Sequence, residues 1–532
     1  MARAICLLVF ILFSIYFSST NAVPLSTKSR WVIDDKTGKR VKLVCANLVG
    51  HAESLLPEGL SKQPLKKIVS QTKLMGFNCV RLTYAVEMFT KNEGVTVYEH
   101  FKKLGLQNAL DGISQNNLHF LELTLIKAHK AVVKEFSKQG IMLILDNQVS
   151  KPMWCCADND GNGFWGDKYF DPQEWLKSLS TVAKMHRHDP MVVGMSLRNE
   201  IRGPNQTESV WREYIEKGAK AVHKANPNVI VIVSGLSYAI RLGFLKSRPL
   251  DLSFKNKIMY ETHRYAFSDG DTRKFEQIGQ LNDVCKNMVQ GLEDNVGFLS
   301  REENPAPIFI SEFGFNQVWN EISGITFFTC FLTYLAETDY EWALWTLQGS
   351  YYYRQGQQDM EELYGMFNLA WNGMRNPQVD SKLQLLQQVL QDPFSNSKEY
   401  HVIFHPSSGK CIRFDNGILH LTDCLGMARF TAGDHSEASP IELVGTNKCL
   451  TATGDGMPVK ITDDCKSNQS SWRLYNKYQI SHVDKHGIDM CLEYDPTYAL
   501  EIVTKKCIFF EDKAKPDNPQ RQWFTLVPSS AQ

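Results

Sequence analysis

Short apolar runs alternate with longer, helix-compatible stretches along residues 40–350 of the 532-residue chain. Eight runs are apolar or β-branched nearly throughout: residues 41–49, 79–83, 141–146, 192–197, 229–234, 258–262, 308–311 and 342–346. The stretches between them have helical periodicity; in residues 123–136, Leu125, Ala128, Val132 and Phe136 share one face. Such alternation indicates a parallel sheet covered on both faces. Eight units over about 300 residues predict a (β/α)8 TIM barrel. An open doubly wound sheet is disfavoured because no Gly-x-Gly-x-x-Gly follows the first run.

The pattern changes from about residue 398 onward, where cysteines fall into three pairs. The pairs are 13, 16 and 16 residues apart: Cys411 with Cys424, Cys449 with Cys465, and Cys491 with Cys507. Their first members follow one another at 38 and 42 residues. Three repeats of about 40 residues indicate a threefold all-β unit. The repeat register predicts one disulfide within each pair.

The first residues have the layout of a secretory signal peptide. Arg3 precedes an apolar run over residues 4–17, and small polar residues follow up to Ala22. A membrane anchor is the alternative, but the run is shorter than the ~20 residues that a span needs. We therefore expect a signal peptide at residues 1–22, a barrel domain at 23–392 and an all-β domain at 398–530, in a secreted protein.

Two further features fit the secretory route. Loss of Cys6 with the signal peptide leaves twelve cysteines, for which an oxidising compartment favours disulfides. Glycosylation sequons begin at Asn205 and Asn468. Lys+Arg and Asp+Glu are balanced at 58 each, which argues against a nucleic-acid partner or a polybasic membrane-binding surface.

Two glutamates end strands on the same predicted face of the barrel. The fourth strand runs into Asn199-Glu200 and the seventh into Ser311-Glu312. Active residues of such barrels lie at the carboxyl ends of the strands. Hydrolysis of a glycosidic bond requires two carboxyl groups. A single glutamate at a strand end is more simply a salt bridge, but the two together favour catalysis by Glu200 and Glu312.

Other strand ends supply partners for these carboxylates. His263 and Tyr265 are two residues apart on the sixth strand and so face the same way. Arg81 on the second strand is placed to keep a neighbouring glutamate ionised. Trp345 on the eighth strand suits the floor beneath a sugar. Packing or a structural ion pair is the alternative for each residue taken alone.

The chain resembles glycoside hydrolase family 5 in its site residues and in their order on strands two, four, six, seven and eight. These residues are Arg81, Asn199-Glu200, His263-x-Tyr265, Glu312 and Trp345. The phrases at residues 77–82 (Phe-Asn-Cys-Val-Arg-Leu) and 310–314 (Ile-Ser-Glu-Phe-Gly) carry the same resemblance. It implies that Glu200 is the acid/base, that Glu312 is the nucleophile of a retaining mechanism, and that Asn199 holds the sugar 2-hydroxyl. Carbohydrate is the implied substrate, and no cofactor or metal is expected.

One departure from the family concerns the third strand. The family usually ends this strand with Asp-x-His, whereas this chain has Asp146-Asn147-Gln148. Gln148 can hydrogen-bond substrate but cannot carry a protonic charge. The identity of the sugar at this position is therefore left open.

The loop after the third strand carries Trp154 and Trp165, which are candidates for sugar-stacking platforms or for loop anchors. Its Asp/Asn/Gly run is typical of calcium loops, but the closing glutamate is absent. Cys155 and Cys156 can pair with each other, pair with distant cysteines, or remain free.

The C-terminal repeats resemble the ricin-B-type β-trefoil. The combination of this trefoil with a family 5 barrel looks like a plant branch of the hydrolase family. The positions that commonly hold a sugar-binding Asp are occupied by Arg413, Thr451 and Glu493. At most weak glycan binding is expected, through Glu493, and the domain is expected to be dispensable for chemistry.

Two functions of different classes remain. One is a secreted retaining glycosidase that cleaves β-linked glucosides, mannosides or related polysaccharides. The other is a lectin-like protein with an inactive barrel. The enzyme is favoured because both carboxylates and their partners are present, whereas two of the three expected lectin ligands are replaced.

Overall fold

The computed structural model describes residues 24–301, 303–318, 321–433, 437–475, 477–494, 501–508 and 517–531. The predicted signal peptide lies outside these residues. None of the helices in the described part of the chain is long and apolar enough to cross a membrane.

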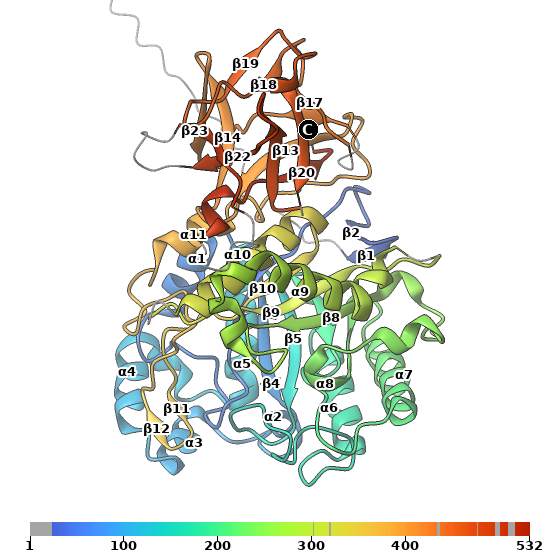
Figure 1. The fold of residues 1–532 in the computed structure, drawn as a ribbon. Coiled ribbons are helices and arrows are strands. Elements are labelled where there is room, and N and C mark those ends of the chain that lie inside the picture. Colours follow the sequence, from blue (N-terminus) through green and yellow to red (C-terminus); the bar gives the residue numbers. More distant parts are fainter. Residues whose placement is uncertain are drawn as a thin grey trace, which may run out of the picture.

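Eight parallel strands form a closed barrel, which confirms the predicted architecture (Figure 1). They are β3 (Val44–Leu48), β4 (Cys79–Ala85), β5 (Met142–Val149), β6 (Val192–Ser196), β7 (Ile230–Ser234), β8 (Ile258–Arg264), β9 (Ile308–Phe313) and β10 (Glu341–Leu344). The last strand pairs in parallel with the first. Each strand overlaps one predicted run, and β4, β5, β8 and β9 extend beyond theirs towards the carboxyl edge because the polar residues there remain in the sheet.

Helices surround the barrel. The longest are α1 (Leu65–Leu74), α4 (Gln107–Asn117), α5 (Leu125–Lys138), α6 (Pro172–Met185), α7 (Glu208–Ala225), α9 (Leu281–Asn295) and α10 (Ile322–Thr338). Helix α5 shows why these segments are helical. The Thr124 side chain caps its first turn by accepting from the Lys127 amide, and Gly140 follows its end with a φ of 79°. The apolar face predicted from sequence is buried.

The barrel is sealed beneath its carboxyl edge. An apolar layer, which includes Ile144, Ile232 and Phe309, fills the amino-terminal half of the interior. A hairpin of β1 (Leu25–Lys28) and β2 (Trp31–Asp34) contributes Leu25 and Val32 to this layer. Among the described residues, this filled layer leaves the carboxyl ends of the strands as the open end of the barrel.

The C-terminal unit is all-β. Twelve strands form one connected sheet, beginning with β13 (Tyr400–His405), β14 (Lys410–Asp415) and β15 (Ile418–Thr422) and ending with β24 (Thr525–Ser529). All three predicted disulfides are present: Cys411–Cys424, Cys449–Cys465 and Cys491–Cys507. The residue after the first cysteine of each repeat, Ile412, Leu450 or Leu492, enters one shared core. This repetition agrees with a threefold unit.

The C-terminal unit is docked on the barrel rather than tethered to it. Trp523 is fully buried, and its indole N–H donates to Asn282 of α9 over 2.9 Å. The Asn282 amide donates in turn to Gln479 of β21 (Gln479–Val483) over 3.1 Å. Figure 1 shows the unit beside α10 and α11 (Pro377–Leu383), while hairpin β11 (Tyr353–Arg354) and β12 (Gln357–Gln358) lies at the other end of the barrel. The unit therefore packs away from the carboxyl ends of the strands.

Candidate active site

Glu200 and Glu312 face each other across the carboxyl end of the barrel. Glu312 lies within β9, and Glu200 follows β6 by four residues. One carboxylate oxygen of each and a ring nitrogen of His263 all lie within 4.8 Å of one another. His263 Nδ1 is 2.9 Å from Glu200 Oε1 and 3.7 Å from Glu312 Oε2. The structure thus brings together the two carboxylates selected from sequence, with the predicted histidine between them.

Glu312 receives hydrogen bonds on both carboxylate oxygens. Arg81 Nη1 donates to Oε1 over 3.0 Å, and Gln148 Nε2 approaches the same oxygen at 3.5 Å. The Tyr265 hydroxyl donates to Oε2 over 3.0 Å. Burial raises the pKa of Glu312, while the charge of Arg81 and the Tyr265 hydrogen bond act in the opposite direction. These donors all favour the ionised form.

Glu200 has a different environment. Burial raises its pKa to about 7, and the charges of Arg202 and Arg81 oppose the shift. Burial also lowers the pKa of His263, which favours the neutral ring, and Nδ1 of this ring is within hydrogen-bond distance of Glu200. A carboxyl group that titrates near neutrality can both deliver and accept a proton at ordinary pH.

Arg81 is the centre of a buried polar layer below the carboxylates. Its guanidinium lies 2.9 Å from Asp146 and 3.5 Å from Glu261, and it donates to the amide oxygens of Asn47 and Asn199 over 2.9 and 2.8 Å. Burial raises the pKa of Asp146 to about 8 against the lowering charge of Arg81. One cation therefore holds the whole carboxylate layer in place.

Sequence reasoning missed Asp146 and Glu261 in this layer. Both stand two residues before a predicted site residue, Gln148 on β5 and His263 on β8. Because side chains two apart on a strand share a face, this spacing was a usable signal.

Several polar atoms around the carboxylates are buried yet lack a hydrogen-bond partner within the described residues. They are Asn199 Nδ2, Gln148 Oε1 and His263 Nε2. Leaving such groups unpaired costs about 1–3 kcal/mol each. A ligand rich in hydroxyl groups would satisfy them, and Asn199 Nδ2 is the donor that the predicted contact with a sugar hydroxyl requires.

A cavity of about 610 Å³ opens above these residues. Its walls include seven residues predicted from sequence: Gln148, Trp154, Glu200, His263, Tyr265, Glu312 and Trp345. Further wall residues come from loops that sequence could not place: His51, Cys155, Cys156, Tyr238, Ile240, Phe267, Arg354, Glu362 and Tyr364. Trp345 packs with Val49, Tyr265 and Tyr351 to form an apolar floor. Aromatic side chains with a few convergent polar groups are typical of a small-ligand site.

The two loop tryptophans have different roles. Trp154 lines the cavity, where the Arg354 guanidinium lies 3.3 Å from the centre of its ring. Trp165 is only 6% exposed and stacks on Tyr214 of α7 at 5.3 Å, with Trp175 of α6 at 5.4 Å. This packing favours a loop anchor between two helices, the alternative to a sugar-stacking platform, and substrate binding by Trp165 stays a prediction.

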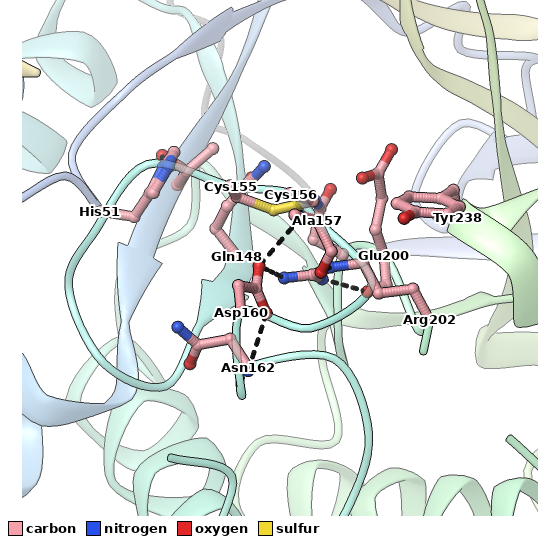
Figure 2. The surroundings of a disulfide bond; sticks show 12 residues. His51, Gln148, Cys155, Cys156, Ala157, Asp160, Asn162, Glu200, Arg202 and Tyr238 are labelled. Carbon is pink, nitrogen blue, oxygen red and sulfur yellow. Dashed lines mark hydrogen bonds and ion pairs between the residues drawn. A yellow bond between two sulfur atoms is a disulfide. The ribbon is translucent and has the colours of Figure 1, made fainter. Parts of the chain in front are cut away.

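The acidic loop after β5 is fixed by ion pairing. Asp160 forms an ion pair with Arg202 and accepts from the amides of Ala157 and Asn162 over 3.1 and 2.8 Å (Figure 2). Two groups of three potential metal ligands occur among the described residues: Glu200 with His263 and Glu312, and Glu200 with Cys155 and Cys156. Both include Glu200, so neither is separate from the carboxylate site.

Comparison with known proteins agrees with this geometry. A model described as cellulase (glycosyl hydrolase family 5) matches residues 35–350. The chain belongs to glycosyl hydrolase family 5. A glycosyl hydrolase 5 family protein of Chamaecyparis obtusa is 41% identical over 545 residues, covering 99% of this chain and 97% of that protein. An endoglucanase of Paenibacillus polymyxa is 21% identical over 301 residues, or 53% of this chain and 69% of the relative. Membership in this family supports glycosidase activity.

Solved structures share the barrel fold. The endocellulase of Pyrococcus horikoshii superposes with a TM-score of 0.57 at 16% identity, covering 69% of this chain and 99% of that one. The catalytic domain of the major endoglucanase of Xanthomonas campestris gives a TM-score of 0.55 at 20% identity, covering 68% and 99%. At these identities the likeness establishes the fold of the barrel.

The C-terminal candidate ligand Glu493 is engaged within the protein. It is 2% exposed, Gln522 donates to it over 2.8 Å, and Arg521 lies 3.2 Å away. Glycan binding through this residue stays a prediction.

Proposed function

We propose that the protein is a retaining β-glycosidase in which Glu312 is the nucleophile and Glu200 is the acid/base. The observation that carries this proposal is the distance between the two carboxylates, whose nearest oxygens lie within 4.8 Å. Retaining enzymes hold their carboxyl groups about 5–5.5 Å apart, whereas inverting enzymes separate them by ~6.5–9.5 Å to admit a water molecule.

The environments of the carboxylates support this division of roles. Glu312 has donors on both oxygens, so its ionised form is prepared to attack the anomeric carbon. Glu200, whose pKa is raised to about 7 by burial, delivers a proton to the leaving oxygen as the glycosidic bond breaks. The Glu200 carboxylate thus formed then takes a proton from water as the water oxygen attacks the anomeric carbon. The bond between the sugar and Glu312 breaks, which restores the Glu312 carboxylate and the protonated Glu200.

A β-1,4-linked glucan is the first substrate to test. Relatives are named endoglucanases, and endocellulase neighbours with a similar fold are described in complex with cellotetraose. β-Mannosides and related polysaccharides remain in the proposal, because Gln148 replaces the usual histidine beside the reacting sugar. Trp345 and the unpaired donor of Asn199 supply a face and a hydrogen bond for such a ring.

Secretion and a trefoil architecture complete the proposal. The N-terminal layout, six disulfides and exposed sequon residues at Asn205 and Asn468 support a secreted glycoprotein. Twelve strands with three regularly spaced disulfides support a ricin-B-type trefoil. The lectin alternative is weaker because Glu493 is already hydrogen-bonded within the protein.

The test is a substrate screen followed by stereochemistry. The purified full-length protein is assayed on β-glucan, mannan, xylan and aryl β-glycosides, with Glu213→Gln on the exposed face of α7 as a control variant. The anomer first formed from the best substrate is then recorded by proton NMR. The proposal expects hydrolysis with the β-anomer appearing first. Initial formation of the α-anomer would exclude the retaining mechanism, and failure on every substrate with correctly folded protein would favour the lectin alternative.

A further inference from the structure

Cys155 and Cys156, which are consecutive in the chain, form a disulfide that lines the active-site cavity. Their sulfur atoms and a carboxylate oxygen of Glu200 all lie within 4.8 Å of one another. Cys155 is 8% exposed and Cys156 is half-buried. In the view of Figure 2, the Glu200 carboxylate lies between this disulfide and the ring of Tyr238. Sequence alone left the pairing of these cysteines open.

Loop stabilisation does not account for this disulfide. In the chain-entropy account, a disulfide stabilises a fold by closing a loop in the unfolded chain. The other five bridges close loops of 13–45 residues, whereas this one joins residues with a sequence separation of 1. In this account the bridge removes almost no freedom from the unfolded state, which turns attention to the surface that it presents to the cavity.

The loop is held by other interactions. Arg202 donates to the Ala157 carbonyl over 3.1 Å and is ion-paired with Asp160. The Tyr238 hydroxyl donates to Asp158 over 2.8 Å. Arg202 also donates to the main-chain oxygen of Glu200 over 2.6 Å. One arginine thus fixes the disulfide loop and the segment of Glu200 relative to each other.

The chemistry of the surface points to a sugar ring. A disulfide has no N–H or O–H donor, and its sulfur atoms are large and polarisable, so it suits the C–H face of a pyranose. Ile240 and Phe267 add apolar surface to the same cavity. The sulfur atoms lie close to Glu200, which belongs to both groups, whereas Glu312 is grouped only with His263 and Glu200. In the proposed mechanism Glu200 protonates the leaving oxygen, so the disulfide borders the leaving group.

We propose that the Cys155–Cys156 disulfide is a binding surface for the leaving sugar and a determinant of leaving-group specificity. This inference rests on the proposed function. The surface contributes only when the departing group has a ring that can pack against the sulfur atoms. A substrate with a monatomic leaving group should not depend on it.

The test compares Cys155→Ala/Cys156→Ala with the unaltered protein on cellotetraose and on β-cellobiosyl fluoride. For cellotetraose, kcat/KM should fall about tenfold, mainly through KM, because apolar contact area is lost. For the fluoride, kcat/KM should change by less than about twofold, because fluoride offers no face to bind. Cys411→Ala/Cys424→Ala, which removes a distant bridge, is the matched control. Equal losses on both substrates, or no loss on either, would overturn the proposal.

A second measurement keeps the cysteines intact in case the double variant does not fold. In Glu312→Gln, which should bind without turnover, saturating cellotetraose should slow reduction of Cys155–Cys156 by a phosphine severalfold, as read by alkylation and peptide mass. The rate at Cys411–Cys424 should not change. Equal rates with and without sugar, or alkylation of both cysteines before reduction, would overturn the proposal.

The same experiments separate this inference from the proposed function. If the unaltered protein turns over neither cellotetraose nor the fluoride, the proposed β-glucan activity fails, and this inference fails with it. If the unaltered protein is active and the double variant behaves identically, only the role of the disulfide fails.

Discussion

Arg81 Nη1 donates a 3.0 Å hydrogen bond to Glu312 Oε1, although the residues stand 231 positions apart in the chain. Their strands, β4 and β9, are not neighbours in the sheet, so the bond crosses the barrel. The same guanidinium contacts Asp146, Glu261 and Asn199. Closure of the barrel is therefore what places a permanent cation beside the proposed nucleophile.

Replacement of Arg81 should affect both rate and pH dependence. We expect Arg81→Ala to lower kcat/KM by a hundredfold or more, on the order of the loss of a key charge-stabilising donor. Since Arg81 lowers the pKa of Glu312, its removal should move the acidic limb of the pH profile to higher pH. Arg81→Lys should move the limb less, because the charge remains.

The profile should be measured on an aryl β-glycoside, with circular dichroism to verify folding. Arg273→Ala, at a side chain that is 80% exposed, is the control. A large loss of activity with an unmoved acidic limb would mean that Arg81 does not act on the ionisation of Glu312.

The pKa of Glu200 predicts an alkaline limit to activity. Burial raises this pKa to about 7, and the acid must be protonated for the leaving oxygen to depart. Activity on an unactivated substrate should therefore decline above about pH 7, as Glu200 loses its proton. In Glu200→Gln, assayed on a dinitrophenyl glycoside that leaves without protonation, the alkaline limb of the first step should be absent. A wild-type rate that still rises at pH 9 would contradict this assignment.

Replacement of Trp165 should mainly lower stability, whereas replacement of Trp154 should mainly weaken substrate binding. Trp165→Ala should cost about 3–5 kcal/mol of unfolding free energy, because it leaves a cavity between α6 and α7, with little change in KM of the folded fraction. Trp154→Ala should raise KM and should reduce stability less, because the side chain lines the cavity. Thermal unfolding and steady-state kinetics of both variants check this prediction. A raised KM in Trp165→Ala together with a large loss of stability in Trp154→Ala would contradict the positions assigned to the two side chains.

We expect docking of the C-terminal unit to affect stability more than chemistry. The buried Trp523 and its hydrogen bond to Asn282 join the two units. We expect Trp523→Ala to lower the melting temperature, with a cost of about 3–5 kcal/mol. Truncation after residue 391 should destabilise the barrel further, because it exposes α10, which is buried along nearly its whole length. The kcat on a small aryl glycoside, corrected for the folded fraction, should be preserved. A stable but inactive variant would show that the C-terminal unit contributes to the site.

The parts of the fold that follow local patterns could be predicted. The strands could be predicted because a strand that is buried on both faces is a continuous apolar run. The buried face of α5 could be predicted because a helix that is buried on one face has apolar residues at helical spacing. The disulfide pairs of the repeats were readable from their register. Glu200 and Glu312 were readable because strand ends of a closed barrel converge.

Features that depend on loop paths could not be predicted. Trp154 and Trp165 stand eleven residues apart in one loop, yet one lines the cavity and the other packs on α7. The pairing of Cys155 with Cys156 and the contribution of Arg354 depend in the same way on backbone paths that no periodicity encodes. The apolar docking of Trp523 on the barrel was hidden because a buried tryptophan within a domain has the same sequence pattern as one at an interface.

The most direct test of the central claim is azide rescue of the two carboxylate variants with an activated β-glycoside. Glu312→Ala should be nearly inactive and regain turnover with azide, which enters the space left by the nucleophile and gives the inverted α-glycosyl azide. Glu200→Ala should instead give the retained β-glycosyl azide, because azide then attacks the sugar bound to Glu312. A β-azide from Glu312→Ala, or near-normal hydrolysis by that variant without azide, would contradict the assignment of Glu312 as the nucleophile.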